Sequence, residues 1–142
     1  LTPAENAFQI EIGKVFACID KLSEQQKYYQ RTRGSHAALI LDSRLEMIAF
    51  AEDVGRHNAL DKAIGKAFVA RKLGQAVIAV MSSRISYELV QKTARAHLPI
   101  LISMSRPTAL SIEMGKALNL TLASADKGSE LIVLCGEKRI LF

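Results

Sequence analysis

Two largely apolar segments, residues 76–81 and 99–104, limit the folds open to this chain more than any other feature. The first reads AVIAVM and is apolar throughout, and the second reads PILISM, with Ser103 near its end. Such runs are typical of strands covered on both faces, as in parallel sheets. Each is followed by a polar turn and a segment with helical spacing, with Ser86 as the expected N-cap of one helix and Pro107 opening the other. We therefore expect two consecutive strand–helix units and a parallel centre to the sheet.

The flanking segments extend this sheet with antiparallel strands. Residues 36–41 and 45–51 predict a hairpin with a short turn. A helix that ends near residue 72 follows the hairpin, and residues 120–123 and 131–135 predict a second, terminal hairpin. The expected fold class is α/β, with a mixed sheet and helices on both of its faces.

The start of the chain carries the signals of a helix. Thr2 is a suitable cap, Pro3 suits the first turn, and Glu5 lies beside the positive end of the helix dipole. This helix is expected to end between residues 21 and 26. No repeat or linker interrupts the sequence, so residues 1–142 are expected to form a single domain.

Charge and hydropathy limit the classes of partner and the cellular location that this sequence suggests. The net charge of +5 favours phosphates or an acidic partner, but the basic residues are scattered and only 6% of the residues are aromatic. Binding of nucleic acid is therefore the least favoured alternative, and we expect no nucleic-acid partner. No signal peptide opens the chain and no apolar run approaches the ~20 residues of a membrane span, so we expect no membrane association and a cytoplasmic location.

Several catalytic and metal-binding templates are missing. Cys18 and Cys135 lie far apart, with no C-x-x-C pair, and are expected to be small buried hydrophobes rather than zinc ligands or a redox pair. His57 is followed by Asn and Ala, not by the x-E that a zinc deaminase requires. The P-loop and G-x-S-x-G motifs are also absent. We therefore assign no catalytic residue, no metal ligand and no zinc to this sequence.

The charged stretch EDVGRHNALDK, residues 52–62, is the strongest candidate site. It joins an apolar strand to a segment of helical spacing, and a helix that begins in a turn directs its unpaired N–H groups at an anion there. Arg56 offers a planar donor fork, Lys62 a point charge and His57 a titratable ring, while Asp53 and Asp61 are placed to orient them. The alternative is structural: Asp53 or Asn58 caps the helix, and the charges form its solvated first turn.

Other polar groups are expected at the same edge of the sheet, because ligands of open α/β sheets lie beyond the carboxyl ends of the strands. Arg56, Arg84 and Arg106 each follow a predicted strand, which suggests convergence on a phosphate or another anion, unless each pairs with a local carboxylate. His36 either faces this site or has a structural role. The segment 126–129 is either a hairpin turn or a backbone nest for a phosphate or a base.

These motifs carry a family resemblance. Residues 52–62 with Gly65 resemble the E-D-V-G-R-H-N-A-x-D-K-x-x-G signature of the formate dehydrogenase accessory proteins, the FdhD family of sulfur carriers. Residues 82–92 are similar to that family's S-[SG]-R-x-S-Y-E-[LM]-V-x-K block, and the segments beginning at Pro107 and Leu120 fall in register.

The resemblance implies a cytidine-deaminase-like three-layer fold without zinc, and a homodimer. It implies a sulfurtransferase role, in which persulfide sulfur from a cysteine desulfurase is passed to the molybdenum cofactor of formate dehydrogenase. That cofactor is a bis-guanine dinucleotide form, so a guanine nucleotide is the expected surrogate ligand. The candidate cofactor-binding residues are Ala125, Asp126, Lys127, Gly128, Ser129, Glu130, Asp53, Gly55, Arg56, His57, Asn58, Lys62, Ser82, Ser83, Arg84 and His36.

Departures from the family pattern leave two readings open. Lys127 stands where Arg is common and Ala125 where Phe is common. The family's sulfur-carrying C-x-x-C lies before the first helix, and neither Cys18 nor Cys135 matches it. We expect the chain to be a cofactor-binding domain that lacks this upstream segment. The alternative is a cofactor chaperone or desulfurase scaffold without chemistry of its own.

Overall fold

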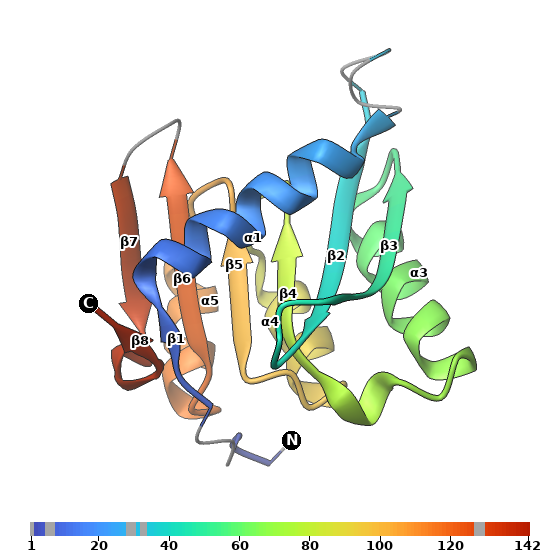
Figure 1. Ribbon diagram of the computed structural model, residues 1–142. Coiled ribbons are helices and arrows are strands. Elements are labelled where there is room, and N and C mark those ends of the chain that lie inside the picture. The colour runs from blue at the N-terminus through green and yellow to red at the C-terminus, as the bar shows by residue number, and fades with distance from the viewer. Residues whose placement is uncertain (1, 5–7, 28–30, 32–33, 127–129) are drawn as a thin grey trace.

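The computed structural model describes residues 2–4, 8–27, 31, 34–126 and 130–142. These residues form a six-stranded sheet in the order β3-β2-β4-β5-β6-β7 (Figure 1). Neighbours β4, β5 and β6 run parallel, whereas β2, β3 and β7 join the sheet antiparallel, which confirms the mixed sheet with a parallel centre. The strands are β2 (His36–Asp42), β3 (Met47–Asp53), β4 (Ala76–Met81), β5 (Ile100–Ser103), β6 (Thr121–Asp126) and β7 (Glu130–Cys135).

Helices cover both faces of the sheet, as predicted. In Figure 1, α1 (Ile12–Gln25) crosses one face, and α3 (Arg56–Val69), α4 (Tyr87–Arg95) and α5 (Ala109–Ala117) lie behind the other. The spacing of Val15, Cys18 and Leu22 aligns these side chains on one side of α1, where they are fully buried against the sheet. The strands between the two layers are therefore apolar on both sides, and every residue of β4 is buried.

The predicted helix start at Thr2 is wrong. Residues 2–4 are not helical, and Glu5 lies outside the described residues. The Ala4 N–H donates to the Leu118 carbonyl and the Asn119 side chain donates to the Ala4 carbonyl, each at 2.8 Å. These contacts hold the segment against the loop after α5, because tertiary hydrogen bonds outweigh a local helix signal. A two-residue strand, β1 (Ile10–Glu11), pairs instead with β8 (Ile140–Leu141), and α1 follows it and ends at Gln25, within the expected range.

Two strands run further than predicted. The return strand of the first hairpin begins at Met47 rather than at Leu45, whose positive φ of 63° belongs to the turn, and it continues to Asp53. Strand β6 continues past Ala123 to Asp126, which pairs with Glu130. Residues 52 and 53 and residues 124–126 therefore belong to strands rather than to the loops that follow them.

The outer edge of β3 is covered by lysine side chains from α3. The ammonium group of Lys66 donates to the Phe50 carbonyl at 2.8 Å, and that of Lys62 donates to the Glu52 carbonyl at 3.3 Å. Because Phe50 and Glu52 are two residues apart, both carbonyls point away from β2. Charged side chains on an edge strand hinder the addition of a further strand.

Candidate functional site

The topology brings the predicted site segments to one edge of the sheet. β4, β5 and β6 end there, the antiparallel β2 begins there at His36, and β3 ends there at Asp53, opposite His36. The same edge carries the hairpin between β6 and β7, at the upper end of the strands in Figure 1. The expected meeting of strand ends is therefore confirmed at the level of the backbone. Arg56, Arg84 and Arg106 all lie at this edge and are exposed.

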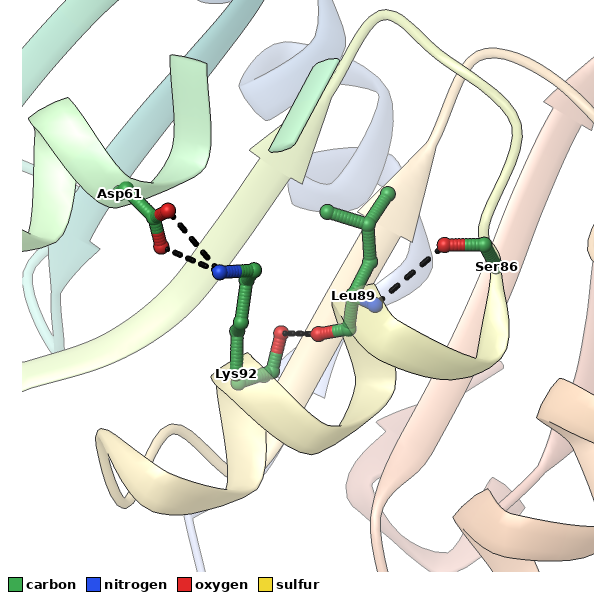
Figure 2. Close-up of polar contacts among 5 residues, drawn as sticks. Asp61, Ser86, Leu89 and Lys92 are labelled. Carbon is green, nitrogen blue, oxygen red and sulfur yellow. Dashed lines mark hydrogen bonds and ion pairs between the residues drawn. The ribbon is translucent and has the colours of Figure 1, made fainter. Parts of the chain in front are cut away.

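Helices α3, α4 and α5 all begin at this edge and are capped differently. Ser86 Oγ accepts from the Leu89 N–H at 3.4 Å at the start of α4 (Figure 2), and Thr108 Oγ1 accepts from the Ser111 N–H at 3.2 Å at the start of α5. The N-cap of α3 is Gly55, which has no side chain to offer. The structural alternative in which Asp53 or Asn58 is the N-cap is therefore wrong.

The first turn of α3 is cationic rather than acidic. It begins with Arg56 and half-buried His57 and contains no acidic residue. The positive charge of Arg56 is unfavourable beside the positive end of the helix dipole, whereas an anion bound there is attracted by both the guanidinium group and the dipole. The start of α3 is therefore better suited to an external anion than the capped starts of α4 and α5.

Asp53 and Lys62 form an ion pair beside this turn. Lys62 Nζ lies 2.7 Å from Asp53 Oδ2, and the Gly55 N–H donates to Asp53 Oδ1 at 2.9 Å. The hydrogen bond from Lys62, followed by those from Gly55 and Asn58, holds the pKa of the Asp53 carboxyl below its usual range. Asp53 thus orients Lys62, as predicted, and its negative charge is compensated within the protein.

Asp61 does not orient the cations of the turn, contrary to our expectation. Figure 2 shows its carboxylate directed at Lys92 of α4, with Lys92 Nζ 2.8 Å and 2.9 Å from the two carboxylate oxygens. This pair joins the two signature segments and links α3 to α4. Its role in the structure is to hold two helices together.

The serine hydroxyls of the β4 exit are used inside the protein. Ser82 Oγ accepts from the Ala37 N–H at 2.8 Å, which joins this exit to β2. Ser83 is buried, and its hydroxyl donates to the Arg84 carbonyl at 3.3 Å. These contacts favour a role for both serines in shaping the exit rather than as ligand groups.

The sequence analysis did not include Ser124 among the candidate residues of this edge, although this residue of β6 pairs with Ser103. Its signal was the equal spacing of Ser82, Ser103 and Ser124.

The hairpin between β6 and β7 is only partly described. Lys127, Gly128 and Ser129 lie outside the described residues. Ala125 is half-buried and pairs with Leu131, and exposed Glu130 pairs with Asp126. The predicted hairpin is confirmed by this pairing, and a role of its turn in binding a nucleotide stays a prediction.

The hollows formed by described residues lie beside this edge or away from it. One of about 550 Å³ flanks β3 and α3 and is lined by Lys62, Lys66 and Glu52 among others. Another of about 680 Å³ lies over β7 and the end of α5. Neither is lined by Arg56, Arg84 or Arg106. Convergence of these guanidinium groups on one pocket therefore stays a prediction.

The two cysteines are buried thiols, as predicted. Cys18 lies in the core beneath α1, and burial raises its pKa to about 11. Burial also raises the pKa of the Cys135 thiol at the end of β7. A thiol that stays protonated is a poor nucleophile, so neither residue has the environment of a reactive cysteine.

Within the described ranges, no group of three His, Cys, Asp or Glu side chains is placed to hold a metal ion. The helices of the same residues are all too short or too polar to cross a bilayer.

Comparison with known proteins places this architecture in a family. Residues 1–141 match the sequence profile of the FdhD/NarQ family. "Sulfur carrier protein FdhD" of Bordetella parapertussis is 37% identical over 143 aligned positions, which cover 99% of this chain and 51% of that protein. The protein of the same name from Sulfurisphaera tokodaii is 34% identical over 89% of this chain and 50% of its own length. The chain thus spans about half the length of the curated relatives it matches.

A solved structure shares the fold. A crystal structure from Desulfotalea psychrophila, described as a candidate formate dehydrogenase accessory protein, superposes with a TM-score of 0.86. The alignment covers 99% of this chain and 60% of that one, at 23% sequence identity. Together with the match over residues 1–141, the relatives at more than 30% identity show that this chain belongs to the FdhD/NarQ family.

Proposed function

We propose that this chain is the cofactor-binding part of a sulfur carrier that serves formate dehydrogenase. The observation that carries the proposal is the start of α3, where Gly55 leaves the helix without a side-chain cap and Arg56 gives the first turn a positive charge. The names of the relatives support a sulfur carrier, and the description of the solved structure supports a formate dehydrogenase accessory role.

The cargo that fits this edge is anionic. Helix N–H groups and a guanidinium fork both favour phosphate oxygens, and Asp53 does not oppose them because Lys62 compensates its charge. We propose that the phosphates belong to a molybdenum cofactor in its bis(molybdopterin guanine dinucleotide) form, which also contacts Arg84 and the hairpin that contains Lys127. Guanosine diphosphate is the corresponding probe.

The rest of the proposal concerns the whole protein. The persulfide sulfur would come from a cysteine desulfurase, the protein would be a cytoplasmic homodimer, and its fold would be of the cytidine-deaminase-like kind without zinc. The thiol that bears the sulfur would be neither Cys18 nor Cys135, because both are buried and have raised pKa values. The contribution of this chain is then to hold the acceptor rigidly while the sulfur is delivered.

A cofactor chaperone or scaffold is the second candidate function. The same two protonated, buried thiols favour it, since they leave this chain without a nucleophile for sulfur transfer. Mass spectrometry of the full-length protein after incubation with a desulfurase and cysteine separates the two functions. A gain of one sulfur atom on a thiol of the carrier supports sulfur transfer, and an unchanged mass supports the scaffold.

Binding of guanosine diphosphate tests the cofactor site. A ligand at one hundred times its Kd stabilises the folded state by about 2.7 kcal/mol, so millimolar nucleotide should raise the melting temperature. Arg56→Ala should reduce this rise, because it removes a donor fork from the start of α3. Arg44→Ala is the matched control, since Arg44 is also exposed but lies in the turn between β2 and β3, at the opposite edge. A melting temperature that nucleotide leaves unchanged would overturn the proposal.

A further inference from the structure

Serine residues recur near the ends of the three parallel strands. Ser82 directly follows β4, Ser103 is the last residue of β5, and Ser124 pairs with Ser103 in the sheet register. Ser103 is completely buried and Ser124 is 1% exposed, so neither hydroxyl is available to solvent. A buried hydroxyl is costly unless it is hydrogen-bonded, and each of these bonds the backbone of a neighbouring segment.

Ser103 joins the exits of β4 and β5. Its hydroxyl donates to the Ser83 carbonyl at 2.5 Å and accepts from the Ser105 N–H at 2.9 Å. One side chain therefore fixes the peptide group that precedes Arg84 and also the backbone of Ser105, which precedes Arg106.

Ser124 and Ser82 continue this row on either side. The Ser124 hydroxyl donates to the Ser105 carbonyl at 2.9 Å, so the segment before Arg106 is held from β6 as well. The Ser82 hydroxyl accepts from the Ala37 N–H and ties the β4 exit to β2. The three hydroxyls thus connect β2, β4, β5 and β6 along the edge where the candidate site lies.

We propose that Ser103 and Ser124 are positioning residues, which hold the backbone beside Arg84 and Arg106 so that both guanidinium groups engage one anionic ligand. This inference rests on the proposed function of the edge as a phosphate-binding site. An Arg side chain loses conformational freedom when it binds, and a mobile backbone beneath it adds to that loss. Fixing the backbone in advance lowers the cost of binding without any contact between serine and ligand.

Thr121→Val provides a matched control for the removal of a buried hydroxyl. Thr121 is fully buried, and its hydroxyl donates to the Gly136 carbonyl at 2.7 Å, but it lies at the first residue of β6, at the opposite end of the strand. Ser103→Ala, Ser124→Ala and Thr121→Val should all lower the melting temperature, because each removes a hydrogen bond of a buried group. Only the two serine variants should also weaken the binding of guanosine diphosphate, by about three- to ten-fold in Kd.

A double-mutant cycle tests whether the serine acts through the arginine. If Ser103 acts by holding Arg84, adding Ser103→Ala to an Arg84→Ala variant should weaken nucleotide binding much less than Ser103→Ala does alone. The same relation should hold for Ser124 and Arg106. Calorimetric titration at a temperature where every variant is folded measures both cycles.

The outcomes separate this inference from the proposed function. A wild-type chain that does not bind guanosine diphosphate overturns both. Wild-type binding that is unchanged in Ser103→Ala and Ser124→Ala, or equally weakened in Thr121→Val, overturns the inference and leaves the proposed function standing. If Ser103→Ala does not fold, Ser124→Ala, which removes a single hydrogen bond, decides the question with its own cycle.

Discussion

Among single residues, Asp53 is an example of a charged side chain in the segment 52–62 that is paired inside the protein. Sequence reasoning placed Asp53, Asp61, Arg56, His57 and Lys62 in one site, because all of them lie within ten consecutive residues of the segment 52–62. The structure assigns Asp53 to Lys62 and Asp61 to a lysine of another helix. A sequence lists charges without their partners, so it could not show that both carboxylates of this segment are paired with lysines.

The Asp53–Lys62 pair predicts a pH dependence of stability. The folded-state pKa of Asp53 lies below its ordinary value of 3.8, so the unfolded chain binds the proton more readily. The stability contributed by Asp53 is therefore present above about pH 4 and is lost as the pH falls through the folded pKa. The free energies of unfolding of the wild type and of Asp53→Asn, measured with urea, should differ at about pH 6, and the difference should shrink as the pH falls below about 4.

Lys62→Met identifies the cause of that dependence. The hydrogen bond from Lys62 is the largest cause of the lowered pKa, so in a Lys62→Met background the effect of Asp53→Asn at about pH 6 should be smaller than in the wild type. A stability difference that grows toward acid pH would contradict the assignment of this ion pair.

The cysteines give a second prediction for single residues. With a pKa of about 11, roughly one Cys18 thiol in a thousand is ionised at pH 8, and the thiolate is the reactive form. Neither Cys18 nor Cys135 should react with iodoacetamide in the native chain, whereas both should react rapidly in urea. Peptide mass spectrometry measures the labelling. Rapid native labelling, or sulfur acquired from a desulfurase on either residue, would show that this chain carries a nucleophile after all.

Among helices and strands, prediction succeeded where periodicity and caps agree and failed where tertiary contacts decide. The run at 76–81 was predicted with its exact bounds, and Ser86 caps α4 as expected. The helix signal at Thr2 failed because Ala4 is bonded to the loop after α5, which lies more than 100 positions away in sequence. No local pattern reports such a contact, and the short pairing of β1 with β8 escaped prediction for the same reason.

The different caps of α3 and α4 predict separate effects on stability and binding. Ser86→Ala should lower the free energy of unfolding by about 1 kcal/mol, because the first turn of α4 loses its side-chain acceptor. The affinity of the Ser86→Ala variant for guanosine diphosphate should stay close to that of the wild type, because the Ser86 hydroxyl is engaged with the Leu89 N–H at the start of α4. Ser86→Asp, which retains a capping oxygen, should restore most of the stability. Urea unfolding and calorimetry measure the two effects, and a large loss of affinity in Ser86→Ala would move this hydroxyl into the binding site.

In the molecule as a whole, the order and direction of the strands bring motifs that are far apart in the sequence to one edge of the sheet. Sequence reasoning predicted that the strand exits meet, because parallel strands separated by helices must end on the same side. It did not predict that the buried hydroxyls of Ser103 and Ser124 connect these exits, because two serines far apart in the sequence are unremarkable until the sheet register pairs them. The chain spans about half of its curated relatives, and sulfur transfer is a property proposed for the whole protein.

The central claim is that the edge formed by the start of α3 and the exits of β4 and β5 binds a guanine-containing anion. Hydrogen–deuterium exchange of the chain with and without guanosine diphosphate tests this most directly, because it reports where the backbone becomes protected. We predict slower exchange in residues 54–58, 82–86 and 103–108, and unchanged exchange in the turn at 43–46 between β2 and β3. Protection confined to the hollow over β7 and the end of α5, or no protection at saturating nucleotide, would contradict the account.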